Sequence, residues 1–538
     1  MKTFITCFFL FFIAFANAQW TTDTSLNTLV ADSEGGDMKA LGGTNGYTYV
    51  VFWKSVAAPT NYELRLQILD TDGNQLLGND GALVSDLIPM STFTVIWSMV
   101  LDANNNLYIG VTGTGGGDPA FVFKMDANGN SLWGPSGENI GNGNLVTVLP
   151  LLDGNIIVSW FSGSGGLMMK MDGNGNDLWP LVQPIEGAAT DVAPANMFEL
   201  SAGDFGMVYH KLIGGINSHL YTQKYDSDGF PVWGAPVQIC NQATAFNRSY
   251  TGLQDGDVMY MGYFGSTGVR FDSFLQRINP DGTLPWGING SDFDTNQTNY
   301  ETYTEIAFEP GSQNIWAVCT YTDPTQNDTG EYVQKFDKDS GARLLGNNAK
   351  EVYAIGSDNV HAGALQLKND SPLFLLKKGF DNGATPTTLD VVYLDENGDF
   401  AWPEESRPVA TFSAHKSRIH YTQPVNNQSV AVFIEKKSGF PKIYAQHFMD
   451  EVLSTEDFPN KLELVYINPV VGEFHVESNL PITQVQIYNV LGQKLLFQEI
   501  AASTQLVLDM SSWQEGIYFV KLQMGNQSKS TLKILKNR

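Results

Sequence analysis

A phrase that recurs about every 55 residues constrains the fold of this chain more than any other feature. Each copy has an apolar segment, a turn of the form Asp-x-Asp/Asn-Gly, and then usually a Trp with Gly or Pro behind it. Clear turns occupy residues 70–73, 126–129, 172–175 and 226–229, and degraded copies follow at 279–282, 337–341 and 395–398. Such a period predicts an array of supersecondary units rather than one conventional core.

The units have the composition of β-propeller blades. In the second unit, apolar segments at 92–100, 107–111 and 120–126 are separated by Gly, Asn and Asp, and Trp133 follows the last turn. Four short strands per unit are typical of propellers, whereas the rungs of parallel β-helices are much shorter. Helical repeats are excluded because no 3.6-residue periodicity accompanies the Thr, Val, Tyr and Gly residues. The fold class is therefore expected to be all-β.

Eight units can be counted at one position of the third strand. The residues there are Gln67, Phe123, Met169, Gln223, Gln276, Gln334, Val392 and Gln446. The eighth unit has no following Trp, but Trp20 lies near the N-terminus, one repeat before Leu77. We expect the segment 19–22 to complete the last blade and so remove an open sheet edge. Seven blades plus an extra strand is the alternative.

The N-terminus predicts export. Residues 1–18 have a basic start, an apolar run and a small-x-small end, so cleavage is expected between Ala18 and Gln19. No other stretch approaches 18 uninterrupted apolar residues, and we expect no transmembrane anchor. The remaining Cys240 and Cys319 lie in different units, so buried free thiols are more plausible than a disulfide.

Charge divides the chain into two regions. The formal net charge is −26, from 31 Lys and Arg against 57 Asp and Glu, and the excess of acids lies before residue 460. This balance argues against nucleic acid or an anionic membrane surface as a partner. We expect a propeller over residues 19–453, a polar linker at 454–460 and a second domain at 461–538.

The second domain carries ordered motifs. Residues 466–469 read Tyr-Ile-Asn-Pro, residues 485–493 contain alternating Val, Ile and Tyr before a turn, and residues 516–522 repeat that alternation. Period-two alternation predicts half-buried strands, with Gly492 and Gly516 at turns. A small antiparallel β-sandwich is expected.

These motifs resemble the type A C-terminal sorting domain of type IX secretion substrates. The positions that carry the resemblance are Tyr466, Asn468, Pro469, Gly492, Gly516 and Tyr518, with Ile467 in place of the first Pro of the family's Tyr-Pro-Asn-Pro opening. The resemblance implies that the type IX machinery is a partner. It also implies a secreted or outer-membrane cell-surface location, with the tail commonly removed after export.

The repeated Asp turns raise the question of calcium. Carboxylates at alternate positions suit hard cations, but Asp or Asn followed by Gly is also what a tight hairpin needs. Since the twelfth-position Glu of an EF-hand loop is absent, a structural turn is the favoured interpretation, and no metal or other cofactor is expected.

A ligand site is expected where the blades differ, on the face opposite the Asp turns. Variable loops there occupy residues 112–119, 212–218, 322–330 and 378–387. Near the channel mouth, at the start of innermost strands, the sequence places Arg248, Tyr250, His361, Arg418 and His420. Their side chains can bind an anionic or sugar ligand through charge-assisted hydrogen bonds and stacking. Pairing with acidic neighbours is the alternative.

The sequence contains no recognisable catalytic motif. Neither a Gly-x-Ser-x-Gly elbow nor a His-Glu-x-x-His pair stands out, and carboxylates are too numerous to single out a catalytic pair. We therefore predict an extracellular binding protein for glycan or protein ligands. A carboxylate-dependent polysaccharide hydrolase or lyase and a purely structural surface protein are the alternatives.

Overall fold

The chain forms two compact units, residues Met1–Asp450 and Glu451–Arg538, in a computed structural model. The structure describes residues 20–32, 37–57, 61–90, 95–187, 191–212, 218–244, 250–268, 270–380, 383–450, 464–525 and 529–538. The expected cleavage point at Ala18 and Gln19 lies outside these residues.

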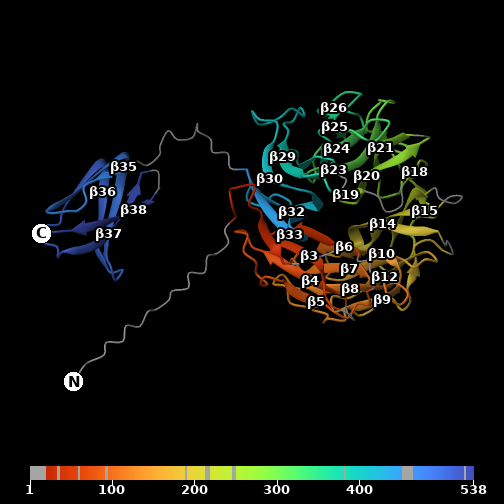
Figure 1. Ribbon diagram of the computed structural model, residues 1–538, viewed down its shortest axis with the longest axis horizontal. Helices are drawn as coiled ribbons and strands as arrows, with labels where there is room; N and C mark the ends of the chain where they lie inside the picture. Colours follow the sequence, from red (N-terminus) through yellow and green to blue (C-terminus); the bar gives the residue numbers. More distant parts are fainter. Residues whose placement is uncertain are drawn as a thin grey trace, which may run out of the picture. The chain divides into compact units, whose positions relative to one another are not determined.

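The first unit is a ring of antiparallel sheets (Figure 1). The first four blades are β2 (Met38–Gly42), β3 (Thr48–Ser55), β4 (Tyr62–Leu69) and β5 (Ala82–Ser85); β6 (Val95–Leu101), β7 (Leu107–Thr112), β8 (Pro119–Met125) and β9 (Glu138–Asn142); β10 (Asn144–Pro150), β11 (Ile156–Phe161), β12 (Gly166–Met171) and β13 (Gln183–Pro184); and β14 (Val192–Glu199), β15 (Phe205–Leu212), β16 (Ser218–Tyr225) and β17 (Val237–Gln238).

Three further blades follow in the same order. They are β19 (Thr251–Asp255), β20 (Val258–Thr267), β21 (Arg270–Ile278) and β22 (Ser291–Asp292); β23 (Tyr300–Ala307), β24 (Asn314–Thr322), β25 (Thr329–Asp337) and β26 (Lys350–Gly356); and β27 (His361–Lys368), β28 (Ser371–Lys378), β29 (Thr387–Tyr393) and β30 (Arg407–Ala414). The short strand β18 (Ala243–Thr244) pairs with both β16 and β20 and so joins blades four and five.

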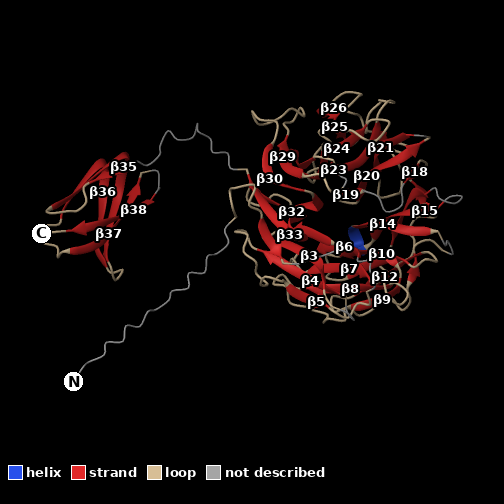
Figure 2. Ribbon diagram, in the orientation of Figure 1, coloured by secondary structure: helices blue, strands red, loops and turns tan. Residues whose placement is uncertain are grey.

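The eighth blade combines the two ends of the ring. Strands β31 (Lys416–Tyr421), β32 (Gln428–Ser438) and β33 (Phe440–Met449) pair in order, and β1 (Thr28–Ala31) adds to β33 in antiparallel register. The fold of the described residues is thus an eight-bladed β-propeller. Figure 2 shows strand throughout the ring, interrupted by the 3-10 turn Ser201–Gly203.

The paired N-terminal segment lies at Thr28–Ala31 rather than at residues 19–22. Trp20 lies in the turn before this strand, as Trp133, Trp179, Trp233 and Trp286 lie before β9, β13, β17 and β22. Each indole of this set donates to a backbone carbonyl in the next blade's Asp turn, at 2.9 to 3.2 Å. The Trp is therefore a contact between blades and lies outside the fourth strand.

The Asp turns share one hydrogen-bond pattern. In the first copy, Oδ1 of Asp70 accepts from the amides of Asp72 and Asn74, and Oδ2 accepts from the Asn74 side chain. Gly73 takes a φ of 84°, which favours glycine. In the third copy, the hydrogen bond from the Asn176 side chain lowers the pKa of Asp172. The carboxylates thus hold the turns in their observed conformation.

The second unit is a five-stranded antiparallel domain. Its strands are β34 (Leu464–Tyr466), β35 (Glu473–Asn489), β36 (Lys494–Asp509), β37 (Gly516–Met524) and β38 (Lys529–Lys536). The ladder between β35 and β36 breaks at Glu477–Ile482, so the strands fold over one core as a small sandwich. That core contains Phe474, Val485, Ile487, Val520 and Ile534, all fully buried or nearly so.

The motif residues of this unit have structural roles. Oδ1 of Asn468 accepts the Leu535 amide at 2.8 Å, and Tyr466 packs edge-on against Phe474. Tyr518 is buried beside Trp513, and Gly492 adopts a positive φ in the β35–β36 turn. The alternation seen in the sequence therefore separates core residues from surface residues in this domain.

Two further expectations concern the whole chain. Cys240 and Cys319 are buried free thiols, as predicted. Among the described residues, no helix is both long and apolar enough to cross a membrane.

Candidate functional site

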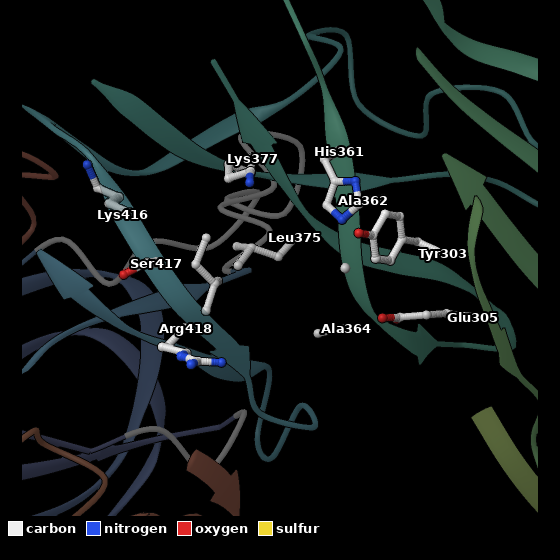
Figure 3. Close-up of a pocket in the computed structure, with 12 residues that line it drawn as sticks. Tyr303, Glu305, His361, Ala362, Ala364, Leu375, Lys377, Lys416, Ser417 and Arg418 are labelled. Atoms are coloured by element: carbon white, nitrogen blue, oxygen red, sulfur yellow. The ribbon is translucent and has the colours of Figure 1, made fainter. Parts of the chain in front are cut away.

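A pocket of about 450 Å³ lies at the inner strands of blades six, seven and eight. It is lined by Tyr303, Glu305, His361, Ala362, Gly363, Ala364, Leu375, Lys377, Lys416, Ser417, Arg418 and Ile419. All but Leu375 and Lys377, which belong to β28, come from β23, β27 and β31. Figure 3 shows Arg418 on one side of the space and Tyr303, Glu305 and His361 on the other.

Backbone bulges shape this pocket. The inner-strand ladders shift register between Thr302 and Glu305, between Gly363 and Gln366, and between Ser417 and His420. Within these shifts, Tyr303, Ala364 and Arg418 have φ values of 53°, 55° and 51°. Non-glycine residues rarely take such values. The inner strand of blade three has the same kind of bulge, with Leu145 at a φ of 56°, so the side chains that the bulges carry distinguish the pocket, not the bulges themselves.

Tyr303 and His361 form one wall. Their rings meet edge to face with centroids 4.7 Å apart. Nδ1 of His361 lies 3.0 Å from the Thr320 hydroxyl, which donates to Glu331 at 3.0 Å. Glu331 is fully buried, and burial raises its pKa to about 8. This hydrogen-bonded chain fixes the orientation of His361 from behind the pocket.

Glu305 is the carboxyl group of the lining. Its Oε2 accepts the Leu365 amide at 2.6 Å and so ties β23 to the bulge of β27. Burial raises the pKa of this carboxyl group, which favours its neutral form.

The two basic residues of β31 have different environments. Lys416 is fully buried, and its Nζ lies 2.9 Å from Glu435 and donates to the carbonyl oxygens of Thr387 and Phe412. Burial lowers the Lys416 pKa. Arg418 is 57% exposed, and its Nε lies 3.2 Å from Asp37 of blade one. Lys416 is thus engaged between blades, whereas Arg418 faces the pocket.

The residues singled out in the sequence are distributed over several places. His361 and Arg418 line the pocket, and Arg248 lies outside the described residues. Tyr250 packs against His210 of blade four, with ring centroids 5.0 Å apart. Nε2 of His420 lies 3.3 Å from the Met38 carbonyl oxygen, and burial lowers its pKa to about 4.

The sequence analysis missed Tyr303, Glu305 and Lys377. None of the lining residues comes from the variable loops that were expected to carry the ligand. For Tyr303 and Glu305, the bulge of β23 decides which side chains reach the pocket, and sequence spacing alone does not reveal that bulge.

Within the described part of the chain, no group of three or more His, Cys, Asp or Glu side chains is arranged to hold a metal ion. The aromatic and ionisable groups of the pocket lining are the Tyr303 ring, the His361 imidazole, the Arg418 guanidinium, the Lys377 and Lys416 ammonium groups and the Glu305 carboxyl group.

The comparison with family models concerns the tail. Residues 464–537 match the family model of the secretion system C-terminal sorting domain. No curated protein matches the chain.

Several solved structures resemble the chain at low identity. Puromycin hydrolase matches at 14% identity and a TM-score of 0.38, over 78% of this chain and 61% of that chain. Prolyl oligopeptidase B from Galerina marginata matches at 9% identity and a TM-score of 0.43, over 76% of this chain and 56% of that chain. The β-propeller domain of the trilobed protease from Pyrococcus furiosus matches at 9% identity and a TM-score of 0.36, over 69% of this chain and 100% of that chain. The chain thus spans 61% of the length of puromycin hydrolase and 56% of the length of prolyl oligopeptidase B.

The family match, the strand order and the motif residues agree on the second unit. Residues 464–537 form a secretion-system C-terminal sorting domain, and the chain is a β-propeller protein exported by type IX secretion to the cell surface or the extracellular space.

Proposed function

We propose that the propeller is an extracellular binding protein that takes a glycan in the pocket of blades six to eight. The observation that carries this proposal is the space of about 450 Å³ between the inner strands of three adjacent blades, with Tyr303 and His361 on one side and Arg418 on the other. The volume falls within the range of small-molecule sites.

The shape favours a glycan over a protein surface. A stable protein interface needs about 800 Å² from each partner, whereas a concave pocket with a few polar groups suits a small ring. Tyr303 and His361 supply an aromatic wall, and Arg418 and Lys377 supply hydrogen-bond donors. Stacking against one wall and hydrogen bonding to the other is how such a pocket binds a sugar.

Binding is favoured over hydrolysis because of the carboxyl groups. Glycosidases use two carboxyl groups on either side of the scissile bond. Among the described residues that line the pocket, Glu305 is the one carboxyl side chain, and its Oε2 already accepts the Leu365 amide.

The test is a glycan array probed with the purified full chain, followed by calorimetric titration of each hit. We expect saturable binding to one class of glycan without cleavage. Release of shortened products would replace this proposal with a hydrolase or lyase. Absence of binding to any glycan, with the protein shown to be folded, would leave the structural alternative or a protein ligand.

A further inference from the structure

The charges at the pocket narrow the class of ligand. The chain as a whole has a formal net charge of −26, yet the lining has His361, Lys377, Lys416 and Arg418 against the single carboxyl group of Glu305. A local reversal of sign in an acidic protein concentrates anions at that place.

These groups do not contribute equally. The Lys416 ammonium is neutralised by Glu435 and lies buried between blades. The Glu305 carboxyl group is shifted toward its neutral form by burial, so it opposes an anion less than an exposed carboxylate does. Arg418 is the exposed cation of the lining, at 57% exposure, and Asp37 at 3.2 Å from its Nε offsets part of its charge.

Arg418 is positioned as an anion-binding group. Asp37 holds Nε at 3.2 Å, and Asp37 is itself anchored because its Oδ2 accepts the Ile96 amide at 3.0 Å. The described residues supply no hydrogen-bond partner for the two terminal nitrogens of Arg418, and Figure 3 shows the guanidinium directed toward the pocket. A guanidinium held by one nitrogen retains a planar pair of donors that matches a carboxylate or sulfate group.

The opposite wall is suited to the ring that carries such a group. Tyr303 is 38% exposed, and its bulged backbone holds the ring against His361 across the space from Arg418. A ligand that reaches both walls has a ring face for Tyr303 and an anionic substituent for Arg418.

We propose that the pocket binds an acidic saccharide, with the anionic substituent of one sugar paired to Arg418 and the sugar ring against Tyr303. This inference rests on the proposed function and specifies its substrate class. The shared chemistry is an anionic group on a sugar, which a uronic acid supplies as carboxylate and a sulfated sugar supplies as sulfate ester.

The experiment titrates the full chain with three matched oligosaccharides: an oligouronate, its methyl ester and a sulfated neutral oligosaccharide. We expect the protein to bind the oligouronate, the sulfated sugar or both. Affinity should fall on the order of tenfold to a hundredfold when the methyl ester replaces the oligouronate, and by a similar factor in the variant Arg418→Gln. Arg418→Lys should recover part of the loss, and added salt should weaken binding.

The control is Lys54→Gln, which removes one positive charge that pairs with the exposed Asp80 at 2.9 Å, outside the pocket. It should leave affinity unchanged. Equal affinity for the oligouronate and its methyl ester, or full affinity in Arg418→Gln, would overturn the acidic-saccharide inference while leaving glycan binding intact. Failure of every saccharide to bind would instead overturn the proposed function itself.

Discussion

The two faces of the ring use the same strands for different purposes. On the turn face, the Trp20, Trp133, Trp179, Trp233 and Trp286 indoles each bond to the next blade, and the Asp carboxylates repeat one turn. At the pocket, Tyr303, Ala364 and Arg418 occupy equivalent bulges but share no chemistry. Repetition therefore marks the contacts that hold the ring together, and differences between equivalent positions mark the candidate site.

The largest effect is expected from the closure of the ring. Deletion of residues 20–31 removes β1, buried Val30 and Trp20, whose ring stacks on His447 at 5.3 Å. It also exposes the edge of β33. We expect the free energy of unfolding to fall by about 5 kcal/mol in urea titrations. Leu26→Ala, at a 60% exposed side chain of the same segment, should change it by less than about 0.5 kcal/mol. An unchanged midpoint on deletion would contradict the role of this segment.

The next effect concerns a buried carboxyl group between blades five and six, that of Glu301, which lies two residues before Tyr303 on β23. Glu301 is 1% exposed and accepts the Ser273 amide at 2.9 Å, and burial, with Asp294 nearby, raises its pKa to about 10. The folded protein keeps this proton where an unfolded Glu, with a pKa near 4.5, has lost it. Stability is therefore lost as pH rises from about 4.5 toward 10.

Glu301→Gln removes this titration and keeps a hydrogen-bonding group. We expect the variant to be more stable than the wild type by on the order of 2 kcal/mol at mildly alkaline pH, with a difference that grows as pH rises. Thermal melts at several pH values measure this difference. Glu309→Gln, at an exposed position of the same blade, should show no such trend. A difference that shrinks with rising pH would refute the assignment.

A smaller effect tests the strain at the pocket. Ala364 has a φ of 55°, so Ala364→Gly should relieve strain and stabilise the protein by about 0.5–1 kcal/mol, net of the entropy that glycine loses on folding. The same change at Ala317, a buried residue of β24, should destabilise. If both substitutions destabilise equally, the bulge is not strained.

The smallest effect is expected from removal of metal ions. Both carboxylate oxygens of Asp70 already accept hydrogen bonds within the turn, and the other clear copies repeat the Oδ1 contacts. Chelation should therefore shift the melting temperature by less than about 1 °C, as measured by differential scanning fluorimetry. A large fall that calcium reverses would show that the turns bind metal after all.

The sequence predicted the repetitive part of the molecule well, because repetition is visible without coordinates. The blade count followed from the third-strand position, and the missing eighth Trp led to Trp20. The predicted position of the closing strand, residues 19–22, was wrong because the Trp lies in the turn before the fourth strand. Spacing alone cannot separate a turn from the strand that follows it.

The pocket could be predicted only in part. The sequence located the starts of the inner strands. A bulge, however, inserts one residue into a strand and so changes which side chains after it face the channel. Counting by twos places Arg418 and His420 on the same face, whereas the shift between Ser417 and His420 leaves Arg418 at the pocket and His420 at the Met38 carbonyl. Tyr303 was missed for the same reason.

The most direct test of the account compares one residue from each face in a single binding titration. Tyr303→Ala removes the aromatic wall of the pocket, and Asp126→Ala removes a turn carboxylate on the opposite face. With the glycan identified on the array and both variants shown to be folded, we expect Tyr303→Ala to weaken binding at least tenfold and Asp126→Ala to leave it unchanged. Lost affinity in Asp126→Ala with full affinity in Tyr303→Ala would contradict the assignment of the site to the pocket of blades six to eight.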